Sequence, residues 1–75
     1  MMNKDLFEND LAIKLQVKPQ DIAFINKIFE GYDGLGTVTT INAQKGLIVV
    51  HVTPETKKEV MEILRNFPKE IHFID

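Results

Sequence analysis

Few residues in this chain of 75 have side chains that could do chemistry. It contains no Cys and no Ser, which excludes thiol or serine nucleophiles and thiolate metal sites. The carboxylates of Glu30, Asp33 and Glu70 have no evident partner placed for acid–base work. Two histidines, His51 and His72, are the remaining soft metal ligands. We therefore expect a protein that binds rather than an enzyme, with no catalytic residues.

Lys18 is the strongest candidate for contact with a ligand, because it stands directly before a helix-like segment that begins at Pro19. The free N–H groups of a helix N-terminus, together with a nearby ammonium group, can hold a carboxylate or a phosphate. We therefore expect a small anionic ligand near Lys18, Gln20 and Asp21. The alternative is that Lys18 is a solvated lysine at the end of a strand.

Alternating and helical hydrophobic patterns predict the elements that position these residues. The patterns predict strands over residues 11–18, 35–42, 47–52 and 71–74, and helices over residues 19–30 and 54–67. The order β-α-β-β-α-β is that of the ferredoxin-like α+β sandwich. We expect a four-stranded antiparallel sheet with two helices on one face. Which face the side chains of residues 35–42 take is left open by the pattern.

The two histidines would face outward from such a sheet, one strand away from the first strand on either side. Neighbouring strands lie about 4.8 Å apart, so the imidazoles of His51 and His72 would start about 10 Å from each other. One metal ion does not easily bridge that distance within one chain. We therefore expect no metal site and no cofactor.

Apolar side chains are expected on the same uncovered face, which would be exposed to solvent in a monomer. Leu47, Val49 and Ile74 would lie there together with His51. An apolar patch of this kind is commonly buried against another subunit, and a two-fold dimer satisfies it with a single self-complementary surface. We expect a homodimer through this patch. The alternative is scattered apolar surface of the ordinary kind.

Charge and composition limit the partners and the location. Nine basic residues face eleven acidic ones, for a net charge of −2, which argues against nucleic acid as a partner. No apolar run approaches the roughly 20 residues of a membrane span, and residues 1–10 contain no apolar signal core. We expect a cytoplasmic protein without a membrane partner. Residues 1–10 would be a flexible lead-in, and residues 11–75 a single domain.

Residues 30–35 read Glu-Gly-Tyr-Asp-Gly-Leu and follow a helix that starts with Pro-Gln-Asp-Ile at residues 19–22. This Glu-x-Tyr-Asp-Gly-Leu motif, with Thr53-Pro54 at the second helix start, resembles an uncharacterised family of bacterial domains of unknown function. The topology also resembles ACT domains, although their loop glycine is replaced here by Lys18-Pro19-Gln20.

The ACT-like resemblance implies a regulatory domain that binds a small metabolite at a subunit interface near the first strand–helix loop. The alternative is a protein-interaction module that uses the exposed face of the sheet. A third alternative, single-stranded nucleic-acid binding, finds little support in the net charge.

Overall fold

The structure is a computed structural model that describes residues 11–32 and 34–74. The predicted lead-in, residues 1–10, lies outside the described residues. The elements follow one another as β1 (Ala12–Val17), the 3₁₀ turn η1 (Pro19–Asp21), α2 (Ile22–Gly31), β2 (Thr37–Asn42), β3 (Leu47–His51), α3 (Lys57–Arg65) and β4 (Ile71–Ile74).

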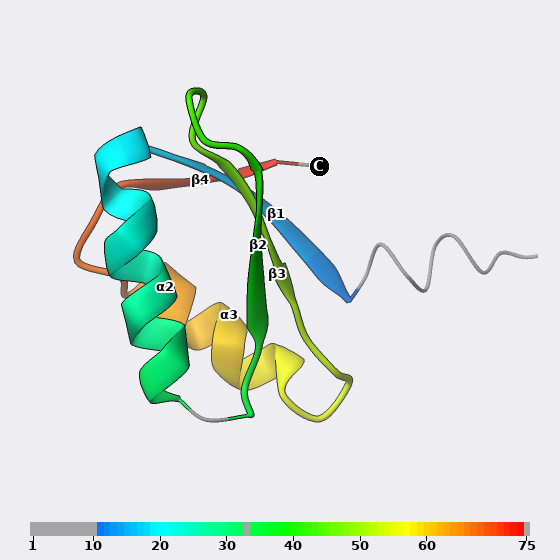
Figure 1. Ribbon diagram of the computed structural model, residues 1–75. Coiled ribbons are helices and arrows are strands. Elements are labelled where there is room, and N and C mark those ends of the chain that lie inside the picture. The colour runs from blue at the N-terminus through cyan, green and yellow to red at the C-terminus, as the bar shows by residue number, and fades with distance from the viewer. Residues whose placement is uncertain (1–10, 33, 75) are drawn as a thin grey trace, which may run out of the picture.

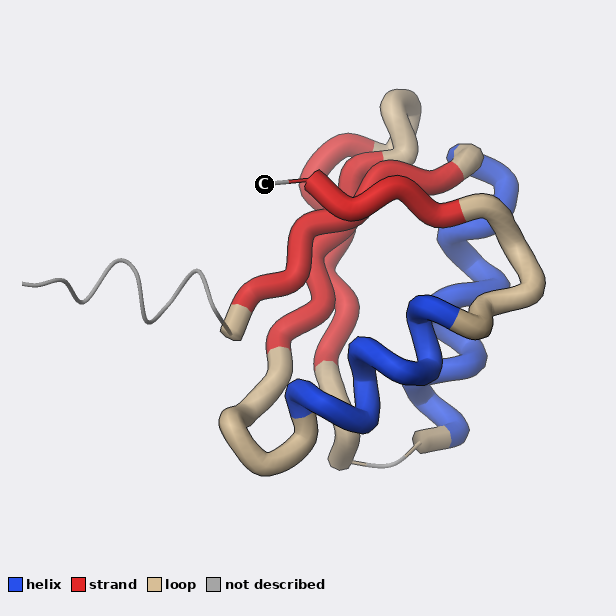
Figure 2. Tube along the Cα trace, turned by 180° about the vertical axis from the view of Figure 1, so that it is seen from behind, coloured by secondary structure: helices blue, strands red, loops and turns tan. Residues whose placement is uncertain are grey.

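The four strands form one antiparallel sheet in the order β2-β3-β1-β4. Both helices cover the same face of this sheet, and the other face is left open (Figures 1 and 2). The α+β class and the ferredoxin-like arrangement predicted from the sequence are therefore confirmed. The 3₁₀ turn before α2 is the one addition to the predicted order.

The core lies between the sheet and the two helices. Its fully buried side chains include Leu15 of β1, Val50 of β3, Ile25 of α2 and Val60 of α3. They come from both layers, the sheet and the helices, so each helix buries its apolar stripe against the same two central strands. Burial of such side chains is the dominant favourable term in folding.

Strand register decides which side chains face the helices and which lie on the open face. Val38 of β2 stands opposite Val50 and faces the core, whereas Thr39 stands opposite Val49 on the open face. This settles the orientation of β2 that the Thr-rich sequence left open. A bulge between Thr40 and Asn42 then interrupts the pairing of β2 with β3.

Helix α2 ends where the glycine signals predicted it would. The Tyr32 N–H donates to the Ile28 carbonyl at 3.2 Å, and the Leu35 N–H then donates to the Tyr32 carbonyl at 3.1 Å. Gly34 has φ +83°, the left-handed conformation that glycine adopts without steric cost. Gly34, rather than Gly31, is therefore the residue that lets the chain turn back towards β2.

The regular part of α3 begins at Lys57, three residues after the predicted start at Pro54. The turn over residues 53–56, which leads into α3, is held by a pair of side-chain hydrogen bonds. The Thr53 hydroxyl accepts from the Thr56 N–H at 3.2 Å, and the Thr56 hydroxyl accepts from the Thr53 N–H at 3.0 Å. This reciprocal pair satisfies two backbone donors that a helix start leaves free. The helix ends at Arg65, earlier than the predicted residue 67.

The other predicted boundaries differ by one or two residues. Strand β1 is shorter by one residue at each end than the predicted 11–18, β2 starts at Thr37 rather than residue 35, and β3 ends at His51 rather than residue 52. The strand β4 has its predicted bounds. Such differences at element ends are small, since the terminal residues lose their ladder partners first.

Gly46, at the end of the β2–β3 turn, touches the end of β1. Its carbonyl accepts from the Val17 N–H at 2.9 Å, and its φ is +72°. A Cβ atom at this position would overlap the carbonyl oxygen of Val17. Gly46 is thus required both by its backbone conformation and by the closeness of β1.

We expect Gly46→Ala to lower the free energy of unfolding by at least about 2 kcal/mol, because a left-handed alanine alone costs about 1–2 kcal/mol and the overlap adds to it. Urea unfolding followed by circular dichroism measures this. Gly31→Ala is the control, since nothing lies within 4 Å of an added Cβ there. Equal losses in the two variants would contradict the tight contact at Gly46.

Candidate functional site

A cleft of about 430 Å³ lies where the end of β1 meets the β2–β3 turn and the start of β4. Three segments far apart in the sequence form it, and antiparallel pairing brings them to the same end of the sheet. The residues that line it are Gln16, Val17, Lys18, Pro19, Lys45, Glu70 and His72. Most of them are polar or charged, so the cleft is suited to a polar ligand.

The Glu70 carboxylate lies between two potential cations in this cleft. Its Oε1 is 4.0 Å from the Lys18 Nζ, and its Oε2 is 2.8 Å from the His72 Nε2. All three side chains are more than half exposed. No partner for Glu70 was evident from the sequence, whereas the fold places Lys18 and His72 next to its two oxygens.

The backbone holds these residues in place through the pairing of β1. His72 stands opposite Gln16 in the β1–β4 pair, and Lys18 directly follows the last residue of β1. The Gln16 Nε2 donates to the carbonyl of Lys45 at 3.2 Å. The Lys45 N–H in turn donates to the Asn42 Oδ1 at 3.0 Å. The turn that carries Lys45 is therefore hydrogen-bonded both to Gln16 of β1 and to Asn42, where the turn begins.

This arrangement offers two ammonium groups and an imidazole around a single carboxylate. An arriving carboxylate or phosphate would meet Lys45 and Lys18, the kinds of donors that form charge-assisted hydrogen bonds with anions. The Glu70 carboxylate already makes contacts of this kind, because it lies next to Lys18 and His72. The negative charge of Glu70 also repels an arriving anion and so opposes the attraction from Lys18 and Lys45.

Of the three predicted ligand contacts, Lys18 alone lines this cleft. Gln20 is exposed and Asp21 is only 9% exposed, and both lie in the 3₁₀ turn η1. Lys45 and His72 were not predicted from the sequence as neighbours of Lys18. The signal that could have found them is strand register, since His72 falls opposite the residue two positions before Lys18.

The predicted interface residues Leu47, Val49, His51 and Ile74 all lie on the open face, by their register with β1. Their exposure differs: Ile74 is 37% exposed, whereas Val49 is only 6% exposed within the single chain. Polar residues surround them on that face. These are Lys14 and Gln16 of β1, Thr37 and Thr39 of β2, and His72 of β4. The apolar part of the face is thus narrower than the pattern indicated.

The two histidines are further apart than strand spacing alone suggested. His51 stands opposite Ala12 and His72 opposite Gln16, so four residues of β1, about 14 Å, separate them along the strand as well. Among residues 11–32 and 34–74, no three His, Cys, Asp or Glu side chains come together to hold a metal ion.

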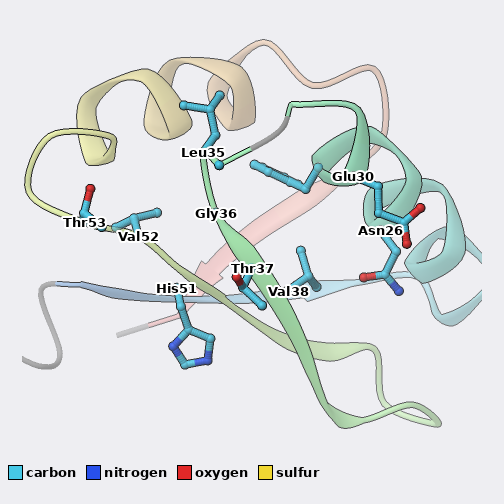
Figure 3. A pocket seen from close by; sticks show the side chains of 11 residues that line it. Asn26, Glu30, Leu35, Gly36, Thr37, Val38, His51, Val52 and Thr53 are labelled. Atoms are coloured by element: carbon cyan, nitrogen blue, oxygen red, sulfur yellow. The ribbon is translucent and has the colours of Figure 1, made fainter.

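A second cavity, of about 530 Å³, lies at the opposite end of the sheet between α2 and the first half of β2 (Figure 3). Asn26 and Glu30 line it from successive turns of α2, and Val38 lines it from β2 (Figure 3). His51 also borders it, but its ring points away towards the open face (Figure 3). This cavity is lined in part by residues of the Glu-x-Tyr-Asp-Gly-Leu motif, Glu30, Gly34 and Leu35.

The fold is that of a small ferredoxin-like α+β domain with one cavity at each end of its sheet. The chain belongs to the family described as "Domain of unknown function (DUF4911)", whose model matches residues 15–71. The resemblance to an uncharacterised domain family is thereby confirmed. No curated protein and no solved structure matches the chain. Within the described residues, neither α2 nor α3 has the length and apolar character needed to cross a membrane.

We expect Glu70→Gln to change the free energy of unfolding by less than about 0.5 kcal/mol, because exposed ion pairs contribute little to stability. Urea unfolding at neutral pH measures this. Leu15→Ala, at a fully buried position, should cost about 2–5 kcal/mol in the same assay and shows that it is sensitive. A loss above 1 kcal/mol for Glu70→Gln would mean that the cluster is structural and not kept for a ligand.

Proposed function

We propose that this domain is a non-enzymatic binding and regulatory module, similar in kind to ACT domains, that holds a small anionic ligand in the cleft at Lys18. The observation that carries the proposal is the pairing of one carboxylate, Glu70, with Lys18 and His72, with Lys45 alongside. These groups leave more positive than negative charge in a cleft large enough for a metabolite.

The proposal extends to a homodimer across the open face of the sheet and to a cytoplasmic location. Ile74 and Leu47 are the apolar residues of that face with surface to bury. The cleft at Lys18 opens beside the same face, since Gln16 and His72 belong to both. A second copy on the open face would therefore sit close to the ligand, which would couple ligand binding to dimerisation.

For the ligand, we expect Lys18→Gln and Lys45→Gln each to weaken binding about fivefold to tenfold, as the loss of one charge-assisted contact at an exposed site implies. Glu70→Gln should strengthen it, because a repelling carboxylate is removed. Isothermal titration with inorganic phosphate, citrate, adenosine monophosphate and a panel of amino acids measures these effects.

Lys58→Gln, on the exposed surface of α3, is the matched control and should bind like the wild type. If every ligand in the panel is silent, or if the two cleft variants bind no worse than Lys58→Gln, the anion proposal fails. If the Glu70→Gln variant binds the ligand more tightly than the wild type does, the result supports the repulsion by Glu70 described above.

For the dimer, we expect the wild type to have the mass of two chains by light scattering and Ile74→Glu to separate it into folded monomers. A charge at this position would be buried against the partner without compensation, which is costly. Phe24→Glu is the matched control, because Phe24 is also 37% exposed but lies on the helix layer. Circular dichroism verifies that each variant is folded.

A wild-type monomer would contradict the dimer and favour the second candidate function, in which the open face docks on a different protein. The observation that favours this candidate is the same half-exposed Ile74 and Leu47, which then have no second copy to cover them. The ligand titrations measure binding in the cleft at Lys18 and do not depend on this outcome, so the two parts of the proposal can fail separately.

A further inference from the structure

Strand β2 is an open edge of the sheet. In the described part of the chain it pairs with β3 on one side and with nothing on the other. Four of its six residues are exposed, among them Thr40, whose register places it towards the helices. Its backbone N–H and C=O groups on the outer side are therefore free to pair with another strand.

The protection that usually blocks such an edge is missing from the first half of β2. Lysine, proline and bulges are the common devices, and residues 37–42 read Thr-Val-Thr-Thr-Ile-Asn, with no charge and no proline. The bulge lies at the far end, between Thr40 and Asn42. The regular stretch from Thr37 to Thr40 thus remains open to pairing.

The second cavity runs beside this open stretch and supplies a place for side chains. Its floor is apolar and consists of Phe29 and Val52, which are 4% and 8% exposed, with the half-buried Leu35 and Val38. A strand added to β2 would direct every second side chain to the helix side of the sheet, above this floor. The apolar side chains of such a strand would find a preformed place there.

Charge at the rim of the cavity is negative. Glu30 is the one Asp, Glu, Lys or Arg among the described residues that line it, and the other polar side chains of the lining are Asn26, Thr37, His51 and Thr53. Glu30 is exposed and lies in the last turn of α2. A ligand that placed a positive charge here would find a carboxylate, and no lysine or arginine is among the described residues of the lining.

The spacing of side chains along α2 is close to that along one face of an extended strand. Asn26 and Glu30 are four residues apart on α2, about 6 Å along the helix axis. Side chains on one face of a strand repeat every two residues, about 6.8 Å. If an added strand runs alongside α2, one of its helix-facing side chains would lie opposite Glu30 and the next opposite Asn26.

We propose that β2 and the cavity beside α2 form a docking site for an extended peptide segment of a partner protein, which adds to the sheet as a fifth strand and places a lysine or arginine opposite Glu30. Pairing with the β2 backbone would supply affinity, and the apolar floor and Glu30 would supply specificity. The site is separate from the cleft at Lys18, which lies at the other end of the sheet, so it does not depend on the anion proposal.

The test is a ¹⁵N NMR titration of the full chain with a blocked hexapeptide of sequence Thr-Val-Thr-Lys-Thr-Val. We expect saturable shifts of the amide resonances of Glu30 and of residues 36–40. The same peptide with Glu in place of Lys should bind about tenfold more weakly, and Glu30→Gln should weaken binding of the Lys peptide about fivefold. Glu59→Gln, on the exposed surface of α3, is the matched control and should bind like the wild type.

Two further probes separate strand addition from simpler binding. A Lys peptide that is N-methylated at alternate residues keeps its side chains but loses its donors to β2, and it should bind at least tenfold more weakly. n-Butylamine carries the same ammonium group without a backbone and should bind more weakly still.

Shifts confined to other parts of the protein, equal binding by Glu30→Gln and Glu59→Gln, or undiminished binding of the methylated peptide would each overturn the proposal. Butylamine that binds as tightly as the peptide would do the same and would identify a site for free amines. If the hydrogen exchange of the β2 amides becomes slower as the protein concentration rises, a second copy of the chain occupies the edge and the proposal is wrong.

Discussion

The pairing of β1 with β3 is the constraint on which the other parts of this domain depend. Leu15 stands opposite Ile48 and Ile13 opposite Val50, and all four are buried beneath the helices. A shift of one residue would turn every one of these side chains to the open face. The hydrogen bond from Val17 to the Gly46 carbonyl secures the register at one end, because only glycine fits so close to β1.

The same register assembles the cleft at Lys18. Strand β1 carries Gln16 and Lys18 to the end of the sheet, where β4 brings Glu70 and His72 and the β2–β3 turn brings Lys45. None of these residues is close to the others by local structure alone, apart from the neighbours within one strand. The polar cluster is therefore a product of antiparallel pairing, and its exposed charges contribute little to stability.

The two ends of the sheet differ in charge, which gives the small domain two distinct surfaces. One end gathers Lys18 and Lys45 around the single carboxylate of Glu70, whereas the other presents Glu30 beside an open strand edge. The near-neutral net charge of the whole chain conceals this separation. Local charge, rather than the total, decides which ligands approach each surface.

The sequence by itself determined the elements and their order. Alternation over β1, the apolar stripes of α2 and α3 and the turn glycines are local signals, because each reflects the period of its own element or the φ of one residue. They sufficed for the ferredoxin-like fold, for the left-handed Gly34 and for the placement of Leu47, Val49, His51 and Ile74 on one face. The family assignment agrees with what the motif at residues 30–35 indicated.

Only the tertiary structure decided what depends on contact between distant segments. The threonines of β2 suit either face, so its orientation became definite only through pairing with β3. Val49 is almost fully buried on a face that is open, which no pattern of alternation can indicate. The meeting of Lys18, Glu70 and His72 likewise follows from the register between β1 and β4. Register is set by the summed packing of the core, and a local sequence pattern does not contain it.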